Sequence, residues 1–375
     1  MPRANKKHPD PLLESEFGAS DTPSLQEQKP SRSTRSRLLW IPAMIGAVAL
    51  VLPSPYVIES PGPALNTIGQ YQGKDLFTID GHETYPTDGN LDMTTVYVAG
   101  GTDRSATTAE VVNAWLNPQA DVQPEDYVYP RGTSQDAVNE ENATQMTDSQ
   151  QDSIAAALSA LKISFDQEIK VGGFASDLNK STVKKNDVLL AINSVPITGT
   201  EQFRQELQKR GDQPSELTVR RDGKETRVTI KTQESPENGR VMGIYLGTSY
   251  TFPFKVNFIL DNVGGPSAGM MFALGIYDKL TPGSMTGGQH IAGTGTIDAG
   301  GHVGPIGGIA QKLVGAKNAG AKYFLAPAEN CEDVVGRIPD GLQVVKVATL
   351  TESIAAVETI AKGGDTSGLA QCTAP

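Results

Sequence analysis

A serine and a lysine, each next to glycine and proline, are the residues of this sequence whose types and spacing best fit catalysis. Ser267 lies in the run GGPSAG (residues 264–269), and Lys312 follows the run PIGGIAQ (residues 305–311). A serine hydroxyl is a poor nucleophile until a base removes its proton, and an uncharged lysine amine can act as that base. We therefore expect Ser267 and Lys312 to form a hydrolytic dyad.

The elements around Ser267 are expected to give it the surroundings of a nucleophile. Residues 256–260 predict a strand, and a helix is expected to run from Ser267 to about Leu280. The start of a helix carries free N–H groups and partial positive charge. We expect the N–H groups of Ser267 and a neighbour such as Gly265 to bind the oxyanion of a tetrahedral intermediate. The alternative is that Ser267 only caps its helix, because serine is a preferred N-cap residue.

Lys312 can act as a base only if its pKa falls far below the ordinary lysine value of about 10.4, to about 7–8. Burial and a position early on a helix that begins near Gly308 would both disfavour the charged amine. We also expect no carboxylate beside it, since residues 310–314 contain none. Lys317 and Lys322 are interpreted as solvated surface charges.

These motifs resemble the Lon family of serine proteases. The resemblance covers about residues 55–362, is strongest over 256–331, and includes AGTG at 292–295 and PIGG at 305–308. It implies that Thr294 hydrogen-bonds the lysine amine and directs its lone pair to the serine. The alternative for Thr294 is an ordinary polar strand residue. The chain departs from the family at Gly264, where such sites often carry an acidic residue.

Residues 165–233 predict a separate, β-rich module. Strands are expected at 169–174 and 187–193, a helix at 200–207, and a hairpin at 217–231 around an Asp-Gly turn. This order resembles a PDZ domain of bacterial proteases, although Asn186 replaces the usual glycine. Such a domain binds an extended peptide beside a sheet edge, here between residues 171–175 and 201–207. The alternative is a packing module that binds nothing specific.

The helix predicted at 148–161, with the stretch 146–161 around it, resembles one near the start of Lon catalytic domains. We infer that the PDZ-like module is inserted into the protease domain. Between Asn117 and Gln145 the chain is polar and contains proline, whereas residues 92–98 predict a strand.

The N-terminal region suggests a membrane anchor. Residues 1–37 are polar and expected to be disordered. Arg32, Arg35 and Arg37 precede an apolar run at 38–52, which places the N-terminus in the cytoplasm and later residues outside it. A spanning helix needs about 20 residues, so we extend the segment to 58 and expect residues 60–63 to form a stiff exit. A cleaved signal peptide is the alternative.

Composition limits the partners. A net charge of −11 argues against nucleic acid. Cys331 and Cys372 could pair outside the cell or stay as free thiols, and two cysteines alone cannot form a zinc site, so no metal or cofactor is expected. Residues 69–74 fall short of a phosphate-binding loop, so we expect no ATP hydrolysis. By analogy with Lon relatives, a homo-oligomer is possible.

The sequence thus predicts an α+β chain in which a Lon-type proteolytic domain holds an inserted PDZ domain and follows one transmembrane helix. The expected divisions are a cytoplasmic tail (1–37), a transmembrane anchor (38–58), the first part of the protease region (59–160), a PDZ domain (161–235), a Lon-like domain (236–362) and a tail (363–375). The expected function is ATP-independent cleavage of extracytoplasmic or membrane proteins.

Two other functions fit parts of the sequence. A catalytically silent, membrane-tethered PDZ scaffold would keep the peptide groove without turnover. The run Gly265–Gly269 also fits the nucleophile elbow of α/β-hydrolases, which needs a later aspartate and histidine. His290 and His302 are the only histidines after Ser267 and are close to it in sequence. We therefore interpret them as turn or surface residues.

Overall fold

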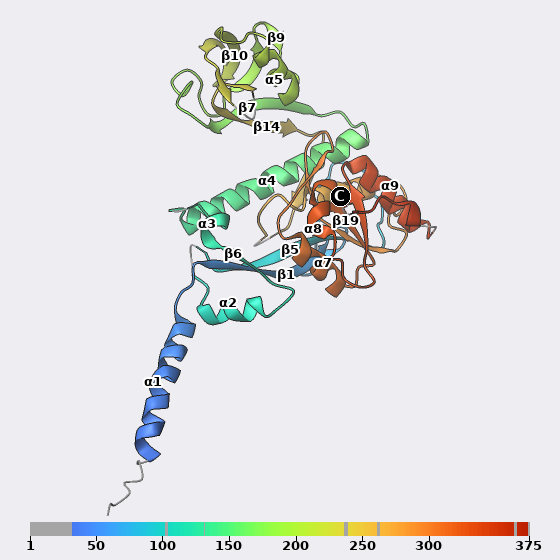
Figure 1. Cartoon of the computed structure of the whole chain (residues 1–375). Helices are drawn as coiled ribbons and strands as arrows, with labels where there is room; N and C mark the ends of the chain where they lie inside the picture. Colours follow the sequence, from blue (N-terminus) through green and yellow to red (C-terminus); the bar gives the residue numbers. More distant parts are fainter. Residues whose placement is uncertain are drawn as a thin grey trace, which may run out of the picture. The chain divides into compact units, whose positions relative to one another are not determined.

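The computed structural model describes residues 32–101, 104–130, 132–235, 239–260, 263–363 and 366–373 (Figure 1). The chain divides into two units, residues 1–52 and 53–375, and each is considered by itself. The expected disorder of residues 1–31 lies outside the described residues.

In the first unit, the described residues form helix α1 (Arg32–Val51). Residues 32–37, expected to be disordered, belong to it. Over the described part of the chain, no helix combines the length and the apolar character needed to cross a membrane, α1 included. The segment predicted to span through residue 58 ends earlier, because Pro53 and Pro55 cannot continue a helix.

Residues 60–63, which were predicted to form a stiff exit from the membrane, belong to a strand of a sheet. Strand β1 (Tyr56–Asn66) includes the run Ser60–Pro63, and Val57 is fully buried. Its pairing with β5 (Asn90–Ala99) shifts register between Pro61 and Ala64. Proline lacks an N–H group, which accounts for an irregularity at this point.

The main sheet of the second unit combines strands from residues 56–124 with strands from residues 290–347. Its strand order is β20-β19-β16-β5-β1-β6. The further strands are β6 (Asp121–Pro124), β16 (His290–Gly293), β19 (Tyr323–Pro327) and β20 (Gln343–Val347). Strands β5, β16, β19 and β20 run parallel, while β1 is antiparallel to β5 and β6.

Helices cover both faces of this sheet. Side chains such as Ile291 and Leu325 share a core with helices α4 (Gln135–Ala160), α6 (Gly269–Leu280) and α9 (Leu350–Ala361). Their neighbours Ala292 and Phe324 pack instead with α7 (Ile309–Asn318). This alternation is what the two-residue period of a strand produces. Ser267, in the turn before α6, and Lys312, on α7, are therefore carried by elements on opposite faces.

The polar, proline-containing stretch 117–145 includes regular secondary structure. It contains β6, the short helix α3 (Glu125–Val128) and the start of α4 (Gln135–Ala160). The Ser134 hydroxyl accepts the N–H of Ala137 at 3.3 Å and so caps α4. The prediction began this helix at 148 because the periodic apolar residues begin only there, whereas its first three turns are mostly exposed.

The second sheet forms the module, with the order β11-β10-β8-β7-β14 and β9 paired to β8. The elements are β7 (Asp166–Phe174), β8 (Val188–Ile192), β9 (Val195–Pro196), α5 (Thr200–Gln208), β10 (Ser215–Arg221), β11 (Lys224–Ile230) and β14 (Ile244–Thr251). The module interrupts the sequence between α4 and the C-terminal strands of the main sheet.

Two turns of the module follow from residues noted in the sequence. Asp222 and Gly223 both have positive φ, 50° and 74°, as the hairpin turn requires. Asn186 takes φ 70° where the family pattern has glycine, a conformation that asparagine tolerates.

The module extends beyond the end that was predicted for it at residue 235. Strand β14 pairs along its whole length with β7, from Ile244–Phe174 to Thr251–Asp166. The sheet therefore continues to residue 251. Single-sequence patterns did not show that β14 returns to the first strand of the module, because this pairing is long-range.

The remaining elements are short and mostly connect the sheets. They are α2 (Thr108–Trp115), β2 (Gln70–Tyr71), β3 (Lys74–Asp75), β4 (Phe77–Asp80), β12 (Gln233–Ser235), β13 (Gly239–Val241), β15 (Lys255–Phe258), β17 (Thr296–Ile297), β18 (Val303–Gly304), η1 (Ala328–Asn330), α8 (Cys331–Val334) and η2 (Thr366–Gly368).

A disulfide closes the C-terminal region. Cys331 at the start of α8 bonds to Cys372, with Cα atoms 5.0 Å apart, and Cys372 packs on the core beneath α7. The pairing left open by the sequence is present. A cross-link over 41 residues reduces the conformational freedom of the unfolded chain.

We expect the double variant Cys331→Ser/Cys372→Ser to lose about 2–4 kcal/mol of unfolding free energy. Urea unfolding without reductant measures this. Reductant should destabilise the wild type by a similar amount and leave the variant unchanged. Coinciding curves for the oxidised wild type and the variant would show that the bond contributes nothing.

Candidate active site

Ser267 lies just before helix α6, not within it. The N-cap residue is Ala268, and no side chain caps this helix. The alternative in which Ser267 serves as the helix cap therefore does not describe this structure. Among the described residues, the Ser267 hydroxyl has no hydrogen-bond partner. It is half-buried and lines a cavity of about 320 Å³.

Helix α4 holds the turn that presents Ser267. The Gly265 N–H donates to the carbonyl of Asn142 at 3.2 Å, and the Ser149 hydroxyl donates to the carbonyl of Pro266 at 2.9 Å. Gly265 has φ 82°, a value that favours glycine. Residues Asn142 and Ser149 were not identified from the sequence, because nothing local links them to a serine more than a hundred residues later.

This arrangement corrects one expectation about the oxyanion hole. The Gly265 N–H was expected to face the substrate, but it is occupied by Asn142. The Ser267 N–H has no acceptor among the described residues. Of the two expected donors, only the Ser267 amide is available in this structure.

Lys312 reaches the same region from helix α7. Gly308 precedes the helix in the left-handed conformation, with φ 67°, and its carbonyl accepts the Lys312 N–H at 3.0 Å. Only 2% of Lys312 is exposed. Its Nζ donates to Thr294 Oγ1 at 3.1 Å.

Thr294 joins the two halves of the site. It follows strand β16, is fully buried, and its hydroxyl donates to the Ser267 carbonyl at 2.9 Å. Because that single proton is committed to Ser267, the hydroxyl oxygen is left to accept from Lys312. Thr294 thus orients the lysine amine at the carboxyl end of a parallel strand.

The electrostatics favour an uncharged amine. Burial lowers the pKa of Lys312 to about 7, and the negative charge of Glu59 opposes this shift. A base with a pKa near the working pH is well matched to proton transfer. Burial, expected from the sequence, is therefore the main cause of the shift.

Glu59 contradicts the expectation that no carboxylate lies near Lys312. It comes from β1, and a Cβ placed on Gly308 would lie 3.2 Å from its Oε2. The sequence prediction considered only the neighbours of Lys312 along its own helix. Contact between α7 and β1 brings the carboxylate in from a distant segment.

Ser267 and Lys312 line one cavity but do not hydrogen-bond to each other here. The cavity is lined by residues of β1, β5 and the turn before α6, including Leu65, Thr95 and Val96. Within the described part of the chain, no histidine lines it. The nucleophile-elbow alternative therefore lacks its base at this site.

The histidines are engaged elsewhere. His290 Nε2 lies 2.6 Å from Asp92 Oδ2, at the opposite end of β16 from Thr294. His302 pairs with Asp298 at 3.0 Å and is largely exposed. His290 is thus a partly buried strand residue, whereas His302 is a surface residue.

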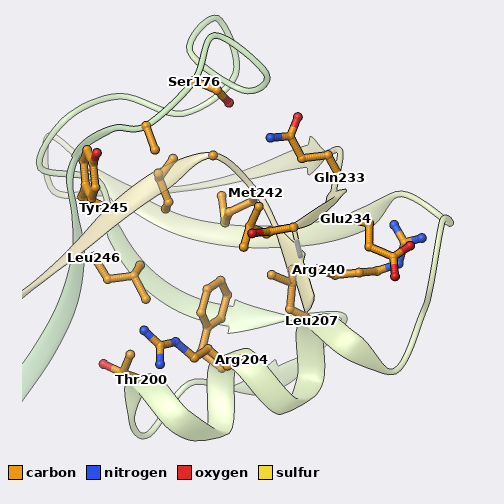
Figure 2. Close-up of a pocket in the computed structure, with 16 residues that line it drawn as sticks. Ser176, Thr200, Arg204, Leu207, Gln233, Glu234, Arg240, Met242, Tyr245 and Leu246 are labelled. Atoms are coloured by element: carbon orange, nitrogen blue, oxygen red, sulfur yellow. The ribbon is translucent and has the colours of Figure 1, made fainter. Parts of the chain in front are cut away.

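The module contains a larger groove, about 860 Å³, between α5 and the start of β14 (Figure 2). Thr200, Arg204 and Leu207 border it from α5, and Tyr245 and Leu246 border it from β14. Of the predicted wall 171–175, only Ala175 lines the groove. Strand β7 is paired on both sides, so the edge beside α5 belongs to β14.

Two Lon proteases illustrate the similarity of the C-terminal region to known proteins. Lon protease 2 of Bacillus subtilis (strain 168) is 37% identical over 90 residues, which is 24% of this chain and 16% of the relative. Lon protease of Lachnoclostridium phytofermentans is 38% identical over 91 residues, or 24% of this chain and 11% of the relative. The match therefore spans only a small part of these relatives.

A solved PDZ domain, from the SdrC-like protein of Listeria monocytogenes, aligns with 21% of this chain and 85% of its own. The identity is 15% and the TM-score 0.20, which is too low to assign the fold of the module.

Residues 262–361 match the family described as the Lon protease (S16) C-terminal proteolytic domain. That range contains Ser267, Thr294 and Lys312. The segment that carries these three residues is therefore similar to the proteolytic domain of Lon proteases.

Proposed function

We propose that this chain is a serine endopeptidase that uses Ser267 as nucleophile and Lys312 as general base. The observation that carries the proposal is the buried Lys312 amine, hydrogen-bonded to Thr294 in the cavity that Ser267 lines. The similarity of residues 262–361 to Lon proteolytic domains supports it.

The first step forms an acyl-enzyme. Neutral Lys312 takes the Ser267 hydroxyl proton while Ser267 Oγ attacks the peptide carbonyl carbon. The resulting ammonium gives the proton to the leaving amine as the peptide C–N bond breaks. A water molecule then attacks the ester and passes a proton to Lys312, and the resulting ammonium returns that proton to Ser267 Oγ as the ester bond breaks. Because the two side chains line one cavity without a hydrogen bond between them, a side-chain movement must first bring them into contact.

Backbone groups would stabilise the intermediate. The Ser267 N–H has no acceptor among the described residues and lies next to the start of α6, where a developing negative charge is favoured. Thr294 would hold the lysine amine in place through both of its hydrogen bonds.

We also propose that the module binds extended segments of the substrate. The groove runs beside the edge strand β14, which can pair with an added peptide strand, and it has apolar side chains such as Leu207 and Met242. Peptide binding here would raise the local concentration of substrate at the protease domain.

An extracytoplasmic, membrane-anchored location is a further part of the proposal. The arginines before the apolar run 38–52 support it, and the disulfide fits an oxidising compartment. Proteolysis without ATP is likewise proposed, because no nucleotide-binding motif was identified in the sequence. A silent scaffold is the second candidate, and retention of Ser267, Thr294 and Lys312 disfavours it.

We expect Ser267→Ala and Lys312→Ala in the purified full chain to reduce cleavage of an unfolded protein at least about 1000-fold, because each removes an essential reacting group. Ser284→Ala, on the loop that follows α6, and Lys317→Ala, on an exposed position of α7, should retain activity. Unchanged rates in both dyad variants would refute the assignment and favour the scaffold.

We expect kcat/KM for a short peptide to rise about tenfold per pH unit below pH 7 and to level off above it, because only neutral Lys312 acts as a base. Steady-state rates, with circular dichroism to monitor folding, test this. A midpoint above pH 9 would mean that Lys312 has an ordinary lysine pKa and is not the proton acceptor.

We expect Thr200→Trp to raise KM for an unfolded protein roughly fivefold or more, about 1 kcal/mol, by filling one end of the groove. Cleavage of a tripeptide substrate should be unaffected because it is too short to reach the groove. Lys224→Trp places the same ring on an exposed hairpin and serves as the control. Equal KM values for all three proteins would exclude the groove from substrate binding.

A further inference from the structure

Glu59 is a half-buried acidic residue with one buried carboxylate oxygen. Its Oε2 atom is inaccessible to solvent and has no partner among the described residues. Burying an unpaired carboxylate oxygen is costly, so its presence in the interior calls for an explanation. The hydrolytic steps described above do not use it.

Its position relates it to the general base. Glu59 lies on β1, which packs against α7, and its Oε2 is 3.2 Å from where a Cβ on Gly308 would lie. Gly308 begins the helix whose first turn carries Lys312. A glycine there allows the carboxylate to approach the helix N-terminus, whose partial positive charge favours an anion.

Glu59 and Lys312 do not form a direct ion pair. The Lys312 amine instead donates to Thr294, and among the described residues no ion pair joins Lys312 to an acidic group. Glu59 therefore acts on the amine through space. Because Lys312 is buried and Glu59 is half-buried, this interaction is screened less than one between two fully exposed charges.

The charges on the surrounding elements are mixed. Burial is the main cause that raises the pKa of Glu59, and Asp121 on β6 raises it further, whereas Lys312 lowers it. Burial raises the pKa of Tyr129, and Glu59 and Glu125 add to that effect. Glu59 also lines a cavity of about 440 Å³, together with Gly308 and Gln311 at the start of α7 and with the charged residues Asp121, Asp333 and Arg337.

We propose that Glu59 is a positioning residue for the general base: its carboxylate, facing the first turn of α7, stabilises the ammonium that Lys312 becomes when it takes the Ser267 proton. The inference rests on the proposed function. Glu59 neither gives nor takes a proton, and the proton moves from Ser267 Oγ to Lys312 Nζ and then to the leaving amine. The negative charge opposes the effect of burial and makes the lysine a stronger base.

The role of Glu59 predicts a change in pH dependence, which a purely structural role does not. In Glu59→Gln the shape is kept but the charge is lost. We expect the rising limb of kcat/KM to move to lower pH by at least about half a pH unit, because the ammonium loses a stabilising charge. The plateau rate should fall severalfold, because a weaker base removes the serine proton less well.

Two variants control this measurement. Glu59→Asp keeps the charge, so its limb should stay close to that of the wild type even if its rate falls. Glu125→Gln makes the same change in net charge on α3, and its limb should not move. An unshifted limb in Glu59→Gln, or the same shift in Glu125→Gln, would overturn the proposal.

A second readout does not need turnover. The Lys312 amine can be titrated by NMR in full chain labelled with ¹³C-lysine, in wild type and Glu59→Gln. A lower midpoint in the variant supports the proposal, and an equal or higher midpoint contradicts it. If Glu59→Gln does not fold, Glu59→Met removes the same charge. An inactive wild type with a shifted titration would refute the proposed function but keep the role of Glu59 in tuning the amine.

Discussion

The burial of one lysine amine is the interaction on which the site depends. Lys312 is placed among apolar groups, where the charged form is disfavoured, and its pKa falls to about 7. The unfolded chain keeps the proton up to about pH 10.4, so at pH 7 this single group costs roughly 4 kcal/mol of stability. Since the unfolded state binds more protons between about pH 7 and 10, the contribution of Lys312 to stability improves as the pH rises through that window.

Three parts of the fold position the reacting residues. Helix α7 brings Lys312 from one face of the main sheet, and α6 brings Ser267 from the other. Thr294, at the end of β16 between them, hydrogen-bonds to both residues. Helix α4 adds the contacts that hold the turn before Ser267.

Helix α4 also links the site to the module. The Tyr250 hydroxyl, at the far end of β14 from the groove, donates to Asp152 Oδ1 on α4 at 2.7 Å. Earlier on the same helix, Ser149 and Asn142 contact the nucleophile turn. The same helix therefore contacts both the strand that borders the groove and the loop that carries Ser267.

Local patterns in the sequence were enough for much of this organisation. The glycine- and proline-rich runs marked Ser267 and Lys312, and the Asp222-Gly223 turn marked a hairpin that the structure contains. Resemblance to Lon proteases singled out Thr294, whose contact with Lys312 is present in the structure.

What the sequence did not reveal depends on contacts between distant segments. Strand β14 joins its sheet by pairing with β7. Glu59 influences Lys312 only because β1 packs on α7. The loss of Gly265 as an oxyanion donor follows from its bond to Asn142, on a helix whose first turns lack an apolar period. Periodicity and motif spacing carry no information on such pairings.

The ionisation of the Lys312 amine in the wild-type chain is the most direct test of this account. A ¹³C-lysine NMR titration, with Lys312 assigned by its loss in Lys312→Ala, would report it without any substrate. The account predicts a midpoint near pH 7. A midpoint above about pH 10, the value of an exposed lysine, would mean that the amine stays charged and cannot serve Ser267 as a base.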